Sequence, residues 1–216
     1  MPTIATNNEL ITVIVLFRVE PEQQQKLIEA IASFLATVKT QPGFVSASIH
    51  KSLDGLKVAN YAQWRSIEDY EAFLQNSEVQ ALGAKLSEFP QPDSQIYEVV
   101  SSDSKVGTPK ISPGGYLVHF AEFRLQPENQ PRMVKLAKEH VEKAMELPGL
   151  ISANFHRSLD GTRVINYGQW LNQDAIEELR KQPGFGSQSP YWEGIAENEF
   201  HLYEVVLTTS DEAKGD

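Results

Sequence analysis

The chain has 216 residues, of which 22% are charged and 41% are hydrophobic, and its formal net charge is −10. This balance is typical of a folded globular protein, and the acidic charge argues against nucleic-acid binding, because phosphate contacts require clustered Lys and Arg. There is no cysteine, which excludes disulfides, thiolate nucleophiles and cysteine-ligated metals. The sequence shows neither a membrane-spanning apolar run nor a signal-peptide pattern, so we expect no membrane contact and a cytoplasmic location.

Five elements are expected in the first half, in the order strand, helix, hairpin, helix, strand. Apolar residues at helical spacing follow Pro21, Pro42-Gly43 ends that helix, and Asp54-Gly55 suits a tight hairpin turn. Ser66 is a suitable N-cap for the second helix. The expected strands are residues 10–19, 44–52, 57–64 and 95–100.

The same pattern returns in the second half. The segment from Pro42 to Trp64 recurs from Pro148 to Trp170 at an offset of 106 residues, and the offset is the same for the first and last strands. A constant offset indicates two copies of one module without a net insertion. The expected division is a first module at 1–102, a linker at 103–115, a second module at 116–208 and a disordered tail at 209–216.

Each copy therefore predicts a ferredoxin-like βαββαβ module of the α+β class, with an antiparallel sheet and both helices on one face. The first strand is apolar on both faces, because Ile11, Val13 and Val15 alternate with residues that include Ile14 and Leu16. The second sheet face must therefore be covered. Packing of the two sheets face to face, as an α+β barrel within one chain, is favoured because linkage raises the effective concentration. Pairing between chains is the alternative, and a homo-oligomer stays open.

The hairpin motif carries a family resemblance. The run His-Lys/Arg-Ser-Leu-Asp-Gly-x-x-Val-x-Asn-Tyr-x-Gln-Trp occurs in both copies. It resembles the antibiotic biosynthesis monooxygenase domain family of the dimeric α+β barrel superfamily. That superfamily includes quinone-forming monooxygenases, haem-degrading enzymes and signal-processing enzymes, so the resemblance implies the fold more firmly than the activity.

The quinone-forming members insert oxygen into a polycyclic phenol or anthrone without metal or flavin, and the resemblance implies their site residues here. Those residues correspond to Asn60, Trp64 and Tyr70 in the first copy and to Asn166 and Trp170 in the second. Ile176 stands where the second Tyr would be, and the family's Arg has no obvious counterpart, with Lys85 the nearest candidate.

These residue types suit the chemistry. An amide and an indole N–H are neutral donors, which can stabilise a substrate anion without quenching the carbanion that reacts with O₂. The leading hypothesis is therefore a cofactor-independent monooxygenase for an aromatic, polyketide-like small molecule, with O₂ as co-substrate. The alternative is a non-catalytic barrel that binds a small hydrophobic molecule or acts in stress-related interactions, with Asn and Trp serving only in packing.

A haem enzyme is disfavoured by residue identity. Phe17 and Phe123 stand where the resemblance to haem-degrading members would require a distal Asn, and the axial His falls near Ala84 or Pro190. Both phenylalanines are expected instead to contact the aromatic ligand.

Two histidines occur only in the second copy, where His119 replaces Val13 and His140 replaces Phe34. We expect them to approach each other in a pocket of the second module, as a general base or a polar anchor for substrate. The alternative is two partly buried histidines bonded to backbone or water. Two histidines without a third ligand do not predict a metal site. Tyr191-Trp192 could wall the same pocket.

Overall fold

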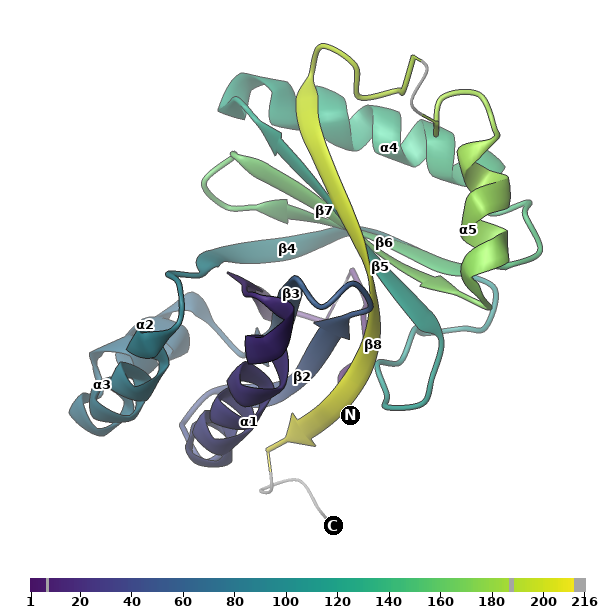
Figure 1. Cartoon of the computed structure of the whole chain (residues 1–216). Helices are drawn as coiled ribbons and strands as arrows, with labels where there is room; N and C mark the ends of the chain where they lie inside the picture. The colour runs from purple at the N-terminus through teal and green to yellow at the C-terminus, as the bar shows by residue number, and fades with distance from the viewer. Residues whose placement is uncertain (7, 187–188, 212–216) are drawn as a thin grey trace.

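Two strand–helix–hairpin–helix–strand modules form the chain, whose computed structural model describes residues 1–6, 8–186 and 189–211 (Figure 1). The first module consists of β1 (Ile11–Arg18), α1 (Pro21–Val38), β2 (Phe44–Ser52), β3 (Lys57–Trp64), α2 (Ile67–Gln75), α3 (Ser77–Gly83), a 3₁₀ turn (Ala84–Glu88) and β4 (Asp93–Ser104). The second consists of β5 (Leu117–Leu125), a 3₁₀ turn (Pro127–Asn129), α4 (Gln130–Ala144), β6 (Leu150–Ser158), β7 (Arg163–Trp170), α5 (Gln173–Arg180) and β8 (Ala196–Ser210).

Local signals in the sequence explain several of these boundaries. Ser66 accepts a hydrogen bond from the backbone N–H of Asp69 at 3.1 Å and so caps α2, as predicted. Asn172 caps α5 in the same way. The two hairpin turns place Gly55 and Gly161 at φ of +81° and +80°, a conformation that favours glycine. The expected elements of both modules are confirmed.

The eight strands close into one barrel in the order β1-β3-β2-β8-β5-β7-β6-β4. The last strand of each module crosses to the other: β4 pairs with β1 and β6, and β8 pairs with β5 and β2. Figure 1 shows β8 running from the α4 side of the molecule to the α1 side. The barrel is therefore formed within one chain, as favoured from the sequence.

The crossing strands are longer than expected. β4 continues to Ser104, inside the range expected for the linker, because its distal part pairs with β6. β8 continues to Ser210, inside the range expected for the tail, because it pairs with β2. Residues 212–216 of that tail lie outside the described residues. A terminal strand that pairs with strands of both modules must be longer than one that pairs within its own module. The sequence of a single module does not reveal this pairing.

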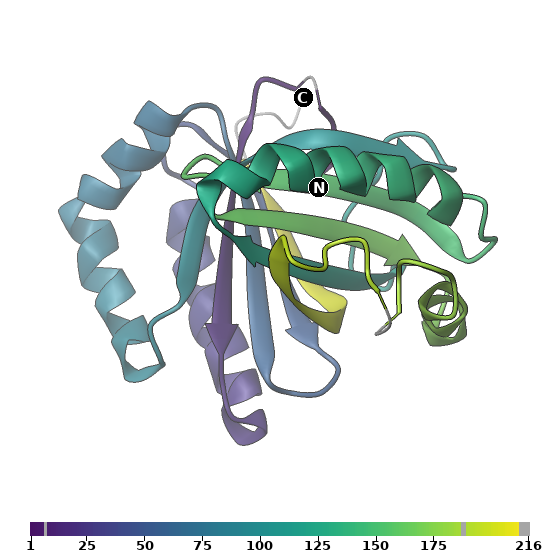
Figure 2. The same ribbon diagram turned by 90° about the horizontal axis from the view of Figure 1, so that it is seen from above.

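The helices lie outside the barrel, α1, α2 and α3 over the first module and α4 and α5 over the second (Figures 1 and 2). The buried face of α1 consists of Leu27, Ile28, Ile31, Leu35 and Val38. No helix in the described ranges is long and apolar enough to cross a membrane.

The barrel interior is filled by aromatic and histidine side chains related by the repeat. His50 Nε2 lies 3.0 Å from the Tyr167 hydroxyl, and His156 Nε2 lies 3.0 Å from the Tyr61 hydroxyl, so each pair joins the two modules. Burial lowers the pKa of both histidines to about 4, which keeps them neutral at neutral pH. The arrangement gives His50 and His156 a structural role at the contact between the two modules.

A buried ion pair breaks the symmetry at one end of the barrel. Lys57 Nζ lies 2.6 Å from Glu122 Oε1, with each side chain only 2% exposed, and Arg124 contacts the same carboxylate at 3.2 Å. The repeat partner of Lys57 is Arg163, which pairs with Asp93 at 3.2 Å and is 22% exposed. The first-module cation is therefore sequestered more completely than its counterpart.

Candidate active site

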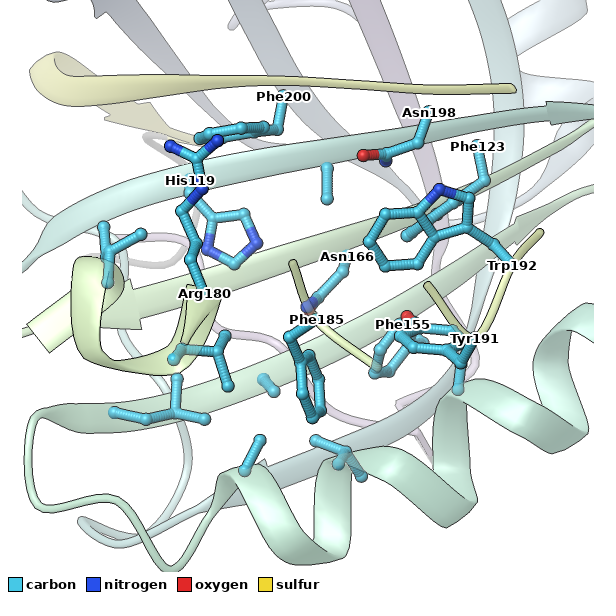
Figure 3. Close-up of a pocket in the computed structure, with 18 of the residues that line it drawn as sticks. His119, Phe123, Phe155, Asn166, Arg180, Phe185, Tyr191, Trp192, Asn198 and Phe200 are labelled. Atoms are coloured by element: carbon cyan, nitrogen blue, oxygen red, sulfur yellow. The ribbon is translucent and has the colours of Figure 1, made fainter. Parts of the chain in front are cut away.

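In each module a cavity lies between the outer face of the barrel and the module's own helices. The first-module cavity has a volume of about 240 Å³ and is lined by β1, β3 and α1 to α3, including Val13, Asn60, Trp64, Tyr70 and Leu74. The second-module cavity has a volume of about 280 Å³ and is lined by β5 to β8, α4, α5 and the segment before β8, including His119, Asn166, Trp170, Ile176 and Arg180 (Figure 3). Both are mostly apolar with a few polar groups, as is usual for small-molecule sites.

In the first-module cavity the predicted residues come together, and Asn60 and Trp64 each leave a polar atom unpaired. Asn60 and Trp64 leave the same face of β3, since four residues separate them. Asn60 Oδ1 and Trp64 Nε1 are buried and find no hydrogen-bond partner within the described chain. Leaving such groups unpaired costs about 1–3 kcal/mol each. A ligand that pairs with both would recover that free energy.

Tyr70 completes this set. Its ring centroid lies 5.5 Å from that of Trp64, and the side chain of Ser94 lies beside its hydroxyl. Burial raises the pKa of the Tyr70 phenol above its ordinary value of 10.0, so the hydroxyl carries its proton at neutral pH. Tyr70 is therefore a proton donor or hydrogen-bond donor rather than a base.

In the second-module cavity the equivalent atoms are already bonded to protein. Asn166 Oδ1 accepts from the backbone N–H of Asn154 at 3.2 Å. Trp170 Nε1–H donates to Nδ1 of His119 at 2.6 Å. The same pair of residue types thus offers a ligand an acceptor and a donor in the first module, whereas in the second module both groups are engaged.

The Trp170 bond fixes the proton on His119. An indole N–H can only donate, so Nδ1 of His119 must present a lone pair, and in the neutral ring Nε2 then carries the hydrogen. Burial lowers the pKa of His119 to about 4, which keeps the ring neutral at neutral pH. Of the two roles expected for His119, the geometry supports a hydrogen-bonding anchor and not a general base.

A glycine makes room for this histidine. His119 on β5 lies opposite Gly168 on β7, and in the first module Val13 lies opposite Ala62. A Cβ on Gly168 would lie 2.5 Å from Nδ1 of His119, which is too close. The second module has therefore exchanged a facing pair of residues, so that an imidazole replaces an isopropyl group on the cavity wall.

His140 does not line the cavity beside His119. Its Nδ1–H donates to the carbonyl of Leu136 at 2.8 Å, one helical turn away, and its ring stacks on Tyr191 at 4.5 Å. Tyr191 lines the cavity, so His140 supports the wall from behind. The expected approach of the two histidines is thus corrected, because the backbone bond holds His140 near its own helix. The predicted wall of Tyr191 and Trp192 is present.

The two predicted phenylalanines have different surroundings. Phe123 lines the second-module cavity, with its ring 5.4 Å from that of Trp192 (Figure 3). Phe17, its repeat partner, is 5% exposed in the apolar core of the first module and is not among the residues that line the first-module cavity. The expectation for Phe17 is corrected: it packs in the core instead of contacting a ligand.

Sequence reasoning missed Arg180, at the end of α5. It lines the second-module cavity with its guanidinium carbon 4.9 Å from the ring centroid of Phe200. The repeat offset, which places Leu74 at the equivalent position, could have identified it. Lys85, the candidate named from the sequence, is exposed in the 3₁₀ turn and lines neither cavity.

No group of three or more potential metal ligands occurs in the part of the chain that the structure describes.

The family model for antibiotic biosynthesis monooxygenase matches residues 10–85 and 117–187. Tetracenomycin-F1 monooxygenase of Streptomyces glaucescens is 42% identical over 73 residues, which cover 33% of this chain and 65% of that relative, less than two thirds of its length.

Solved structures share this fold over more than nine tenths of the chain. An anthrone oxidase-like protein superposes with a TM-score of 0.87 at 25% identity, covering 98% of this chain and 97% of that one. A proposed monooxygenase from Fusobacterium nucleatum superposes with a TM-score of 0.65 at 10% identity, covering 93% and 94%, and shares the fold. With one matched segment in each module, the chain belongs to the antibiotic biosynthesis monooxygenase family.

Proposed function

We propose that the protein is a cofactor-independent monooxygenase that uses O₂ to oxidise an aromatic, polyketide-like small molecule in the first-module cavity. Membership of the family and the relative in Streptomyces support a monooxygenase-like function. The observation that carries the finer proposal is the pair of unused polar atoms, Asn60 Oδ1 and Trp64 Nε1, buried in an apolar cavity beside Tyr70.

The two atoms have opposite hydrogen-bonding character, which defines the substrate they fit. Asn60 Oδ1 accepts from a substrate hydroxyl, and Trp64 Nε1–H donates to a keto or enolate oxygen. Four residues of strand separate their backbones by roughly 13 Å. A hydroxylated anthrone carries a keto oxygen and hydroxyl groups on a fused-ring frame, and spans such a separation better than a single ring.

The reaction follows from these positions. The substrate loses a proton to solvent, and Trp64 stabilises the charge that develops on its oxygen. The carbanion form gives its electron pair to O₂ and a C–O bond forms. The peroxide takes a proton, for which Tyr70 is placed as donor. Loss of water then breaks the O–O bond and the remaining C–H bond, so that one oxygen atom stays in the new carbonyl and the other leaves as water.

The test uses anthrone as substrate, with O₂ uptake and anthraquinone absorbance as paired readouts. Trp64→Phe removes the N–H and keeps the ring, and should lower kcat about 100-fold, as for loss of one oxyanion donor. Trp170→Phe is the matched control and should change kcat less than about 3-fold, because that N–H is bound to His119. Absence of O₂ uptake by the wild-type protein, or equal losses in the two variants, contradicts the proposal.

The second-module cavity favours a different role, namely ligand binding without turnover. Its Trp170 N–H and Asn166 carbonyl are engaged by protein, and Ile176 provides no proton. A catalytically inactive but ligand-binding second site therefore accounts for the geometry of this half.

A further inference from the structure

We propose that the second-module cavity is selective for an aromatic carboxylate, bound by Arg180 at the rim and by the Nε2–H of His119 on the wall, whereas the first-module cavity takes uncharged aromatic ligands. The inference rests on the proposed function only for the aromatic character of the ligand. The two cavities share their position in the fold, so the difference between their ligands follows from the residues that have been exchanged.

The first exchange is one of charge at the rim. Arg180 is the one permanently charged side chain among the described residues lining the second-module cavity, and no such residue lines the first-module cavity, where Leu74 takes its place. A guanidinium nitrogen of Arg180 lies 3.5 Å from Oε1 of Glu177, and the two side chains are 47% and 54% exposed. Such exposed pairs contribute little. The guanidinium therefore keeps most of its donors for a ligand.

A second exchange fixes the direction of that guanidinium. The guanidinium carbon of Arg180 lies 4.9 Å from the ring centroid of Phe200 on β8, and the repeat partner of Phe200 is Ser94, whose side chain lies beside the Tyr70 hydroxyl in the first module. In the second module Ile176 replaces that tyrosine. The Tyr–Ser pair of one rim has thus become an apolar surface on which an arginine can lie flat, as cation–π contacts favour.

The third exchange supplies a deep donor. Figure 3 shows the imidazole of His119 between Arg180 and Asn166 on the cavity wall. Because Trp170 occupies Nδ1, the ring presents Nε2–H to a ligand and adds no charge of its own at neutral pH. A carboxylate between them gains a charge-assisted bond to Arg180 and a neutral bond to His119. The aromatic part of the ligand is left for the walls formed by Phe123, Tyr191 and Trp192.

The experiment compares 2-naphthoate with its uncharged analogue 2-naphthamide by calorimetric titration under nitrogen. Arg180→Leu installs the first-module residue, and should weaken naphthoate binding about 10-fold while changing naphthamide binding less than about 2-fold. Arg157→Leu is the matched control, since it removes one positive charge on β6 from a residue that lines neither cavity. Naphthoate binding by this control should equal wild type. Equal losses for both ligands in Arg180→Leu, or no loss, overturn the proposal.

A second variant tests the deep donor without relying on the rim. His119→Val with Gly168→Ala reproduces the facing pair Val13 and Ala62, a combination that already packs in the first module. It should weaken both ligands about 10-fold and leave the ratio of their affinities unchanged. Unchanged affinity in a variant with a normal melting curve excludes His119 as a ligand contact. Wild-type stoichiometry should be one naphthoate per chain, and two contradicts the difference between the cavities.

These titrations need no turnover, so their outcome is separate from that of the oxygen assay. If the protein binds naphthoate selectively but consumes no O₂ with anthrone, the proposed reaction is wrong and the proposal for the second-module cavity stands. Anthrone oxidation with no preference for naphthoate does the reverse.

Discussion

The two modules are alike where they meet and different where they face their own helices. Inside the barrel, His50 pairs with Tyr167 and His156 pairs with Tyr61 in matching geometry. On the outer face, by contrast, the Asn–Trp pair of the first module is unbonded, whereas both members of the second pair bond to protein. Packing at the shared centre constrains both halves together, but each cavity contacts only its own module. One chain can therefore hold two sites of different chemistry in one symmetric frame.

The largest expected effect concerns pH. His50 and His156 in the shared interior and His119 in the second-module cavity all have a pKa lowered by burial to about 4, below the ordinary value of 6.5. The unfolded chain then binds more protons, so stability is full above pH 6.5 and is lost as the pH falls toward 4. At pH 5 the loss is about 2 kcal/mol for each histidine.

Urea unfolding between pH 7 and 5 measures this loss. The double variant His119→Val with Gly168→Ala should lose about one third less stability over the same range than wild type, because two of the three buried histidines remain. That difference isolates the histidine that only one module has. A pH-independent midpoint in the wild type would show that the interior histidines are not held neutral.

The second expected effect concerns the unequal ion pairs. Lys57→Met leaves Glu122 buried with only Arg124 beside it, and should lower the free energy of unfolding by about 3–5 kcal/mol. Arg163→Met, the repeat-related change, removes a partly exposed partner of Asp93 and should cost about 1 kcal/mol. Urea titration at pH 7 gives both values. Equal costs would mean that the two ion pairs contribute equally to stability despite their different burial.

The smallest effect is a gain of function. Leu74→Arg with Ser94→Phe transfers the rim of the second-module cavity to the first, and should create a second naphthoate site per chain with an affinity about 10-fold above that of Leu74→Arg alone. The reason is that the aromatic surface holds the guanidinium in place. Calorimetric stoichiometry is the readout. If the variant still binds one naphthoate per chain, an arginine at the rim is not sufficient to create an anion-binding site.

Much of the fold could be predicted because its signals are local or repeated. The constant offset revealed the duplication, and two-sided apolar strands required a cover that the other module provides. Asn60, Trp64 and Tyr70 were placed together correctly, since strand alternation and the turn after β3 determine their directions. The length of β4 was not predictable from one module, because its distal half pairs with β6 of the other module.

The site residues that were predicted wrongly or missed depend on contacts between segments that are far apart in the sequence. His140 was expected at the cavity from helical spacing, but its bond to Leu136 keeps the ring against its own helix, outside Tyr191. Phe17 and Phe123 occupy the same repeat position, yet only Phe123 lines a cavity, where Trp192 packs beside it, whereas Phe17 lies in the apolar core. Arg180 escaped notice because its partner Phe200 comes from β8, twenty residues later in the chain. Where a cavity remains depends on such distant contacts.

The crossing of β4 and β8 also determines what happens if the covalent connection is cut. Each half would keep its hairpin and helices, but its terminal strand would extend from the body with half of its backbone groups unpaired. Co-expressed fragments divided within residues 105–115 should therefore reassemble by mutual strand donation. A single fragment alone would be left to recruit a second copy of itself, which would give a particle with two identical cavities instead of two distinct ones.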